Sequence, residues 1–191
     1  SNTITVNPET ATTYYVTGTD LTGCTGTTSI TIDVIIPPTV SVSGKDVCIG
    51  KPSTILAEGA LSYVWDNTLG VGASKNVSPS TSTVYSVTGT DKDGCSGTAS
   101  INISVYPSPI INTTGSEICI GNQGSVFAEG AESYLWNNNL PPLSSNSVSP
   151  GNTTSYSVTG TDINGCTATA EAIVIVNPLP TFTITPLTQK C

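Results

Sequence analysis

The six cysteines of this chain are its most reactive side chains, and their spacing is regular. Cys48 and Cys95 are 47 residues apart (95 − 48 = 47), and Cys119 and Cys166 are separated by the same interval (166 − 119 = 47). Zinc sites and redox-active dithiols need closely spaced pairs such as Cys-x-x-Cys, and the sequence contains none. Regularly spaced cysteines in so polar a chain therefore predict structural disulfides formed in an oxidising compartment.

The other polar residues offer no catalytic set. The sequence has no histidine, so a Ser–His–Asp triad would lack its base. Glu58 and Glu129 are equivalent to one another, and a single carboxylate per repeat does not make an acid–base pair. The sequence therefore predicts that this stretch of chain is not an enzyme and holds no cofactor.

Asp91, Asp93 and Gly94 match part of a calcium-binding loop. The second aspartate is replaced by Thr22 and Asn164 in the two equivalent segments, so the ligand set does not persist. A turn in which the aspartate side chain accepts hydrogen bonds from the backbone that follows explains the pattern better. We therefore expect a hairpin turn here and no metal site.

These residues belong to a repeat. Trp65 recurs as Trp136 (136 − 65 = 71), Tyr85 recurs as Tyr156 at the same offset, and the run Val-Thr-Gly-Thr-Asp appears three times. Self-similarity at a fixed period, here 71 residues, indicates a tandem array. The predicted units are a C-terminal half-repeat at 1–36, complete repeats at 38–107 and 109–178, and the start of a further repeat at 180–191.

Each complete repeat has the pattern of about seven short strands. In the first, alternating or β-branched runs predict strands at 39–43, 53–57, 61–65, 76–78, 83–88 and 97–105, and residues 67–75 are a loop or a ragged edge strand. So many short strands in one period predict an all-β fold of tandem Ig-like β-sandwiches. The aromatic residues expected in the cores are Trp65, Tyr85, Trp136 and Tyr156. If these rings were exposed, they would instead form a surface for stacking sugars.

The composition excludes two classes of partner. The formal charge is −8 at pH 7 and only 9% of the residues are charged, whereas binding to nucleic acid needs a basic surface. No apolar run is long enough to span a membrane as a helix. The repeats are separated by proline-containing linkers at 37–38, 107–109 and 178–180, which favour extended and semi-rigid connections.

The order of the motifs resembles that of a known repeat family. The chain is similar to the PKD-like/Ig-like repeats of Bacteroidetes cell-surface proteins through Cys48-Ile-Gly, Ala57-Glu-Gly-Ala, Ser62-Tyr-Val-Trp, Val77-Ser-Pro, Tyr85-Ser-Val-Thr-Gly-Thr-Asp and Gly94-Cys. Those proteins include very large gliding-motility adhesins exported by the type IX secretion system. The resemblance implies a structural stalk or filament repeat of a secreted adhesin at the cell surface, used for gliding or attachment. It implies neighbouring repeats, other surface proteins and glycans as partners. A carbohydrate-binding surface module is the alternative.

The pairing of the cysteines has two solutions. The default pairs join the two cysteines of one repeat, as Cys48–Cys95 and Cys119–Cys166. However, Cys48 is expected in the turn before the second strand and Cys95 in the turn between the last two strands. In a simple Ig-like topology these two turns lie at opposite poles of the sandwich. The alternative is a bond across the junction, Cys48–Cys166, which would lock successive repeats together.

The incomplete repeats at the two ends carry the remaining cysteines. Residues 1–36 supply only the later strands of a sandwich, so Val16 and Ile30 would lack the strands that cover them. We expect the array to continue at both ends, with Cys24 and Cys191 bonded to partners outside these 191 residues.

Overall fold

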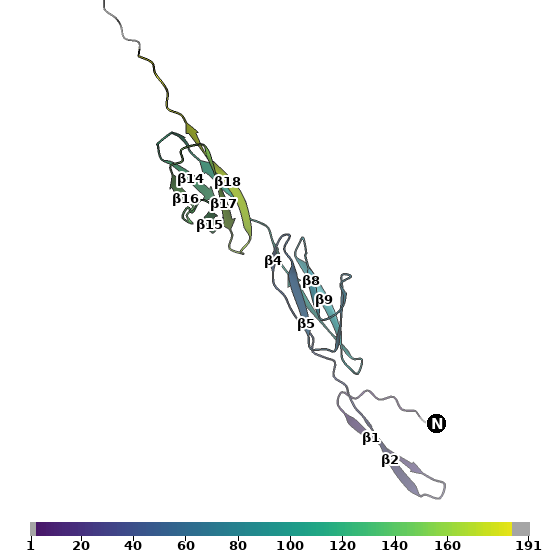
Figure 1. The fold of residues 1–191 in the computed structure, drawn as a ribbon. Helices are drawn as coiled ribbons and strands as arrows, with labels where there is room; N and C mark the ends of the chain where they lie inside the picture. The colour runs from purple at the N-terminus through teal and green to yellow at the C-terminus, as the bar shows by residue number, and fades with distance from the viewer. Residues whose placement is uncertain (1–2, 185–191) are drawn as a thin grey trace, which may run out of the picture. The chain divides into compact units, whose positions relative to one another are not determined.

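The chain is rich in β-branched and turn residues, which favour strands over helices. A computed structural model describes residues 3–184. Within that range the chain forms eighteen strands, and it contains no helix that is long and apolar enough to cross a membrane (Figure 1). The fold is all-β.

Residues 41–103 form the first complete β-sandwich. One sheet has three strands, in the order β3 (Ser41–Ser43), β5 (Ser53–Glu58) and β8 (Ser74–Val77). The other has four, in the order β10 (Ser96–Ile103), β9 (Thr83–Thr90), β6 (Ser62–Trp65) and β7 (Gly70–Val71). Buried and exposed residues alternate along β5, as they do in a strand with one face on a core.

The second β-sandwich has an equivalent three-stranded sheet, and its other sheet differs at the edges. Its three-stranded sheet has the order β12 (Asn112–Gly115), β14 (Gly124–Glu129) and β16 (Ser145–Val148). Its four-stranded sheet has the order β13 (Glu117–Cys119), β18 (Thr167–Asn177), β17 (Thr154–Thr161) and β15 (Ser133–Trp136). β14 begins 71 residues after β5 (124 − 53 = 71), and β17 begins 71 residues after β9 (154 − 83 = 71).

A short parallel pairing occurs at equivalent positions of both repeats. In the second it forms one edge of the four-stranded sheet, and in the first it is a separate two-stranded sheet. β13 runs parallel to the end of β18, with Cys119 opposite Asn177. In the earlier repeat the corresponding strands are β4 (Val47–Cys48) and β11 (Val105–Tyr106). They are also parallel, with Cys48 opposite Tyr106. The sequence-based expectation of a turn at these cysteines is wrong, because each forms a short strand whose parallel partner lies almost sixty residues further along the chain.

The predicted half-repeat at 1–36 contains a hairpin. β1 (Thr12–Thr19) pairs antiparallel with β2 (Thr25–Ile32), and Thr12 lies opposite Ile32. The same register recurs between β17 and β18, where Thr154 lies opposite Val174.

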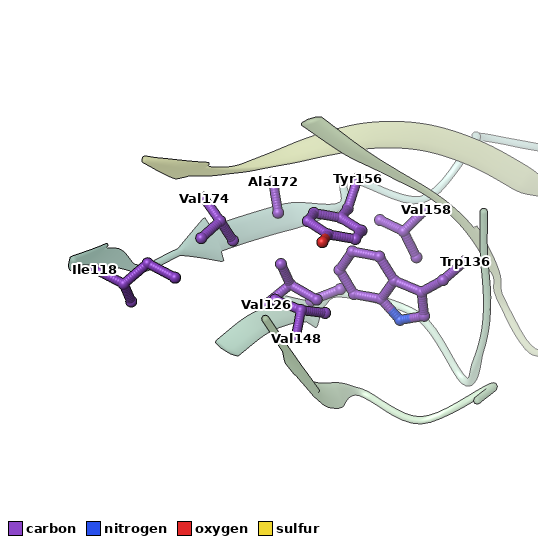
Figure 2. Close-up of a cluster of buried hydrophobic side chains, with 9 residues drawn as sticks. Ile118, Val126, Trp136, Val148, Tyr156, Val158, Ala172 and Val174 are labelled. Carbon is purple, nitrogen blue, oxygen red and sulfur yellow. The ribbon is translucent and has the colours of Figure 1, made fainter. Parts of the chain in front are cut away.

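The core of the second sandwich joins its two sheets (Figure 2). The rings of Trp136 and Tyr156 lie beside one another and face Val126 and Val148 of the three-stranded sheet. The full cluster is Ile118, Val126, Ala128, Trp136, Val148, Tyr156, Val158, Ala172 and Val174. Such aromatic rings contribute most of the apolar area that a small sandwich can bury.

In the two complete repeats, close packing requires the glycine of the Val-Thr-Gly-Thr run, whereas Gly18 of the first copy has open space around it. A Cβ atom at Gly160 would collide with the side chain of Ile111 and would lie 2.8 Å from the Cβ of Ala131. A glycine inside a strand often marks such a close approach.

The chain divides into two compact units. The first comprises the described residues up to Lys45 together with 54–77 and 84–102, and the second comprises 46–53, 78–83 and the described residues from 103 onward. The second unit therefore contains the second sandwich, β4 and β11, and with them both Cys48 and Cys166.

Candidate functional site: a disulfide between successive repeats

A disulfide joins Cys48 to Cys166, which are separated by 118 positions in the sequence. Their Cα atoms are 5.6 Å apart, an ordinary separation for bonded cysteines. Cys48 belongs to the predicted repeat at 38–107 and Cys166 to the one at 109–178, so the bond connects one repeat to the next.

Strand β4 holds the first of these cysteines in place. The backbone N–H of Val47 donates to the carbonyl oxygen of Ser104 at 3.0 Å. The carboxylate of Asp46 accepts from the N–H of Ser104 at 2.7 Å and from the hydroxyl of Tyr106 at 3.3 Å. Cys48 is thereby held against the end of β11, where the earlier repeat ends.

The Cys-Ile-Gly motif makes the turn that follows. The N–H of Lys51 donates to the carbonyl oxygen of Cys48 at 3.0 Å, which closes a four-residue turn. Gly50, the third residue of that turn, has a φ of 76°, a conformation that glycine adopts without steric cost. The chain can therefore leave the sheet immediately after the cysteine.

An aspartate turn holds the second cysteine. Oδ1 of Asp162 accepts from the backbone N–H of Asn164 at 2.9 Å and from that of Cys166 at 2.8 Å. The same carboxylate pattern occurs at Asp20 and Asp91, so all three copies form the turn that their sequence predicts. In the bonded copy, Cys166 is fully buried.

The turn in the N-terminal hairpin has one additional hydrogen bond. The hydroxyl of Thr22 donates to Oδ1 of Asp20 at 2.7 Å, beside the N–H groups of Thr22 and Cys24 at 2.8 and 2.9 Å. These bonds, that from the Thr22 hydroxyl first, hold the pKa of Asp20 below its ordinary value of 3.8.

Pairing within a repeat, predicted as Cys48–Cys95 and Cys119–Cys166, is wrong. Cys166 directly precedes β18, whereas Cys119 lies opposite Asn177, the last residue of that strand. Eleven strand residues separate the two positions, a span of roughly 35 Å at the usual rise per residue. This distance is several times the Cα separation that a disulfide allows. The bond that forms is the alternative across the junction, Cys48–Cys166.

Three cysteines of the described chain are unbonded. Cys24 and Cys119 are exposed, and Cys95 is half-buried. Cys191 lies outside the described residues. Bonds from Cys24 and Cys191 to partners beyond this sequence remain predictions.

The four aromatic residues expected in the cores are buried. Their exposed fractions are 3% for Trp65, 4% for Trp136 and 6% for both Tyr85 and Tyr156. Each indole N–H also has a partner in its own sandwich, since Trp65 donates to the carbonyl of Gly72 and Trp136 to that of Leu143, both at 2.8 Å. A buried and hydrogen-bonded ring cannot stack on a sugar, so these tryptophans form no sugar-binding surface.

The carboxylates are dispersed over the surface. Between residues 3 and 184, no group of three or more acidic or cysteine side chains is arranged to hold a metal ion. The carboxylate of Asp93 contacts the ammonium group of Lys92 at 2.6 Å. Glu58 and Glu129 are exposed at the ends of their strands.

Comparisons with known proteins give only distant similarities. No family model matches the chain, and no curated protein matches it. A structure of a 1.5-MDa bacterial ice-binding adhesin is 15% identical with a TM-score of 0.42, covering 90% of this chain and 76% of that one. A Ca²⁺-stabilised adhesin of an ice-binding Antarctic bacterium is 14% identical with a TM-score of 0.45, covering 90% of this chain and 58% of that one. Sidekick-1 immunoglobulin domains 1–5 are 12% identical with a TM-score of 0.30, covering 88% and 46%. These similarities are too distant to assign the chain to a family.

The sequence identified the cysteines but missed the strand that positions half of them. In both complete repeats an apolar residue precedes and follows the first cysteine, as Val47 and Ile49 and as Ile118 and Ile120. That short alternation was the available indication of β4 and β13. Its parallel partner lies almost sixty residues further along the chain, so no local pattern could reveal the pairing.

Proposed function

We propose that these residues are stalk repeats of a large secreted adhesin at the cell surface, that the disulfide between them carries mechanical tension, and that they have no catalytic role. The observation that carries the proposal is the bond between Cys48 and Cys166. It connects two repeats covalently, and in the described residues neither cysteine belongs to a metal-binding cluster. A cross-link of this kind is useful where a chain of domains is pulled from its ends.

Covalent connectivity explains the mechanical effect. Tension applied to the two ends of the chain reaches Cys48 and crosses the disulfide directly to Cys166. Residues 49–165, which include β5 through β17, lie in a closed loop that carries no tension between the ends. Even if these strands unfold, the loop cannot lengthen the chain.

Two further features favour an extracellular stalk. Disulfides of this structural kind persist in oxidising compartments outside the cytoplasm. The formal charge of −8 keeps neighbouring chains apart on a crowded surface. Export by a type IX secretion system, and use in gliding or attachment, rest on the motif resemblance described above.

The buried tryptophans favour a stalk over a carbohydrate-binding module. A sugar-binding surface needs exposed aromatic rings, and Trp65 and Trp136 are enclosed in their cores. We therefore assign the aromatic residues to folding stability.

Pulling a single molecule from its two ends tests whether the disulfide carries the tension between the repeats. With the bond intact, full unfolding should release a chain shorter by about 118 residues than after reduction. At the maximal length per residue this is a difference of roughly 390–420 Å in contour length. A Cys119→Ser variant should match the oxidised wild type, and a Cys166→Ser variant should match the reduced chain. Equal contour lengths before and after reduction would refute the role.

Microscopy on cells tests the location. Antibodies against residues 38–178 should decorate thin surface fibres on intact cells in electron micrographs. Labelling that appears only after the cells are opened would exclude a surface stalk, whatever the pulling experiment shows.

A further inference from the structure

The two unbonded cysteines of the complete repeats have the same local structure as the two bonded ones. Cys119 ends β13 as Cys48 ends β4, and each lies opposite the last residue of a parallel strand. The turn that follows is also the same. The N–H of Asn122 donates to the carbonyl of Cys119 at 3.0 Å, and Gly121 has a φ of 87°. Cys119 is therefore presented as Cys48 is, but it is exposed.

Cys95 has the structure of Cys166. Oδ1 of Asp91 accepts from the N–H of Cys95 and from that of Asp93, both at 2.9 Å. The backbone N–H of Asp91 donates to the carbonyl of Cys95 at 2.9 Å, as Asp162 does to Cys166 at the same distance. The turn is formed before any bond is made, so Cys95 is preorganised for a partner.

The partner cannot belong to the same repeat. The first and second cysteines of a repeat lie at opposite ends of its last strand, as the pairing of β13 with β18 shows. The bond Cys48–Cys166 shows which cysteines can pair, because it joins the first cysteine of one repeat to the second cysteine of the repeat that follows.

We infer that this bond is one of a series in which the first cysteine of each repeat bonds to the second cysteine of the next repeat. We call this series the disulfide ladder. Wherever a further repeat follows, Cys119 is the binding site for its Asp-x-x-Gly-Cys turn. Wherever a repeat precedes, Cys95 is the binding site for its Cys-Ile-Gly turn. The partner on each side is another repeat of this kind. This inference deepens the proposed stalk function and rests on it, because the ladder is useful only in a chain of consecutive repeats.

Each new bond is a two-electron oxidation. Two thiols lose two protons and two electrons as the S–S bond forms, and a disulfide oxidant accepts them. With oxidised glutathione as that oxidant, the products are one protein disulfide and two reduced glutathione molecules. Exchange proceeds through a mixed disulfide that the second thiolate attacks.

The ladder would limit the length of the whole array. Each bond spans 118 positions while the period is 71, so consecutive loops overlap by 47 residues (118 − 71 = 47). Cys191 aligns with Cys48 and Cys119 as the first cysteine of a predicted further repeat, so in the ladder it would bond to a later repeat. From Cys166, tension would therefore follow the backbone for only 25 positions before it reached the next bond (191 − 166 = 25). Unfolding of any one repeat would then add almost no length.

An added repeat tests the inference in the full chain. A second copy of residues 109–179, inserted after Leu179, preserves the period and the proline-containing linker. After refolding with reduced and oxidised glutathione, non-reducing peptide mapping should find Cys119 joined to the copy of Cys166. Alkylation of Cys119 should be lost, alkylation of the copy of Cys119 should appear, and the bond Cys48–Cys166 should remain. In a matched control with serine in place of the copied Cys166, Cys119 should stay fully alkylated.

A second insertion tests the other direction. A copy of residues 38–108 placed after Pro37 should bond its first cysteine to Cys95 and leave its second cysteine free. Thermal unfolding of both extended chains, compared with the original, shows whether the added repeat folds, and the two insertions serve as independent trials. The ladder would be refuted if an added repeat folds while Cys119 or Cys95 stays reactive. It would also be refuted if Cys119 bonds to the first cysteine of another repeat, or Cys95 to the second. That result would not change the contour-length difference that the bond Cys48–Cys166 produces on pulling. The ladder and the proposed function can therefore be refuted separately.

Discussion

The hairpin β1–β2 and the strands β17–β18 share one local structure in two different surroundings. Their registers are equivalent, and both turns are closed by an aspartate carboxylate. Val16 of the hairpin is nevertheless 59% exposed, whereas its counterpart Val158 is 0% exposed. An exposed groove lined by Ile4, Val6, Tyr14, Tyr15, Val16, Ile30 and Ile32 lies along the hairpin, where β17–β18 have a closed core.

The difference shows which properties are local and which are not. Strand pairing, register and turn geometry are the same with or without a second layer, because β-branched residues and the aspartate turn specify them. Burial requires the facing sheet of β12, β14 and β16 together with β15, which carries Trp136. A two-stranded hairpin alone is marginally stable in water, so the facing sheet supplies most of the stability.

Removing Trp136 should make β17–β18 resemble the hairpin and should give the largest effect. Trp136→Ala leaves a cavity among Val126, Val148 and Tyr156, and should lower the free energy of unfolding of its sandwich by roughly 3–5 kcal/mol. Trp136→Phe retains a ring but removes the indole donor to the Leu143 carbonyl, which still accepts from the amide of Asn146 at 3.3 Å, so the lost hydrogen bond should cost about 0.5–1.5 kcal/mol. Denaturant unfolding followed by hydrogen exchange in β17 measures both. A loss below 1 kcal/mol for the alanine variant would show that this core does not depend on Trp136.

The disulfide is the second difference between the two regions, since Cys166 is bonded and Cys24 is free. Replacing both Cys48 and Cys166 by serine should destabilise the second compact unit by roughly 2–5 kcal/mol, as expected for the loss of a native disulfide. Cys24→Ser should have no measurable effect. Thermal unfolding of the three proteins under non-reducing conditions compares them. Equal midpoints for the double variant and the wild type would mean that the bond does not stabilise the fold.

The same contrast explains what the sequence could predict. Motifs such as Val-Thr-Gly-Thr-Asp predicted strand, turn and period, because each depends on residues close together in the chain. Trp65 and Trp136 could be identified as core residues because a tryptophan on the third main strand of an Ig-like sandwich usually packs into its core. The cysteine pairing could not be derived, since it depends on the parallel pairing of β4 with β11. That pairing joins distant segments and decides at which pole Cys48 lies.

Matched valines measure the facing sheet more finely. Val158→Ala removes two fully buried methyl groups and should cost about 1.5–3 kcal/mol. Val16→Ala, at the equivalent position of the hairpin, should change the free energy of unfolding by less than about 0.5 kcal/mol. Urea unfolding of the two single variants gives the comparison. Similar losses at both positions would show that the hairpin is covered in solution.

The smallest expected effect is a pH dependence at the turn of the hairpin. The hydrogen bonds to Asp20, from the Thr22 hydroxyl first, hold its pKa below 3.8. The ionised carboxylate therefore stabilises the turn fully above 3.8, and this stabilisation is lost as the pH falls through the lowered pKa. An NMR titration should show the amide of Cys24 losing protection from exchange in that acidic range, while Asp20→Asn removes this dependence. Thr22→Val deletes the hydroxyl that the copy with Asn164 also lacks, and should raise the pKa of Asp20 toward 3.8. An unchanged pKa in the valine variant would assign the shift to the backbone N–H groups, which all three turns share.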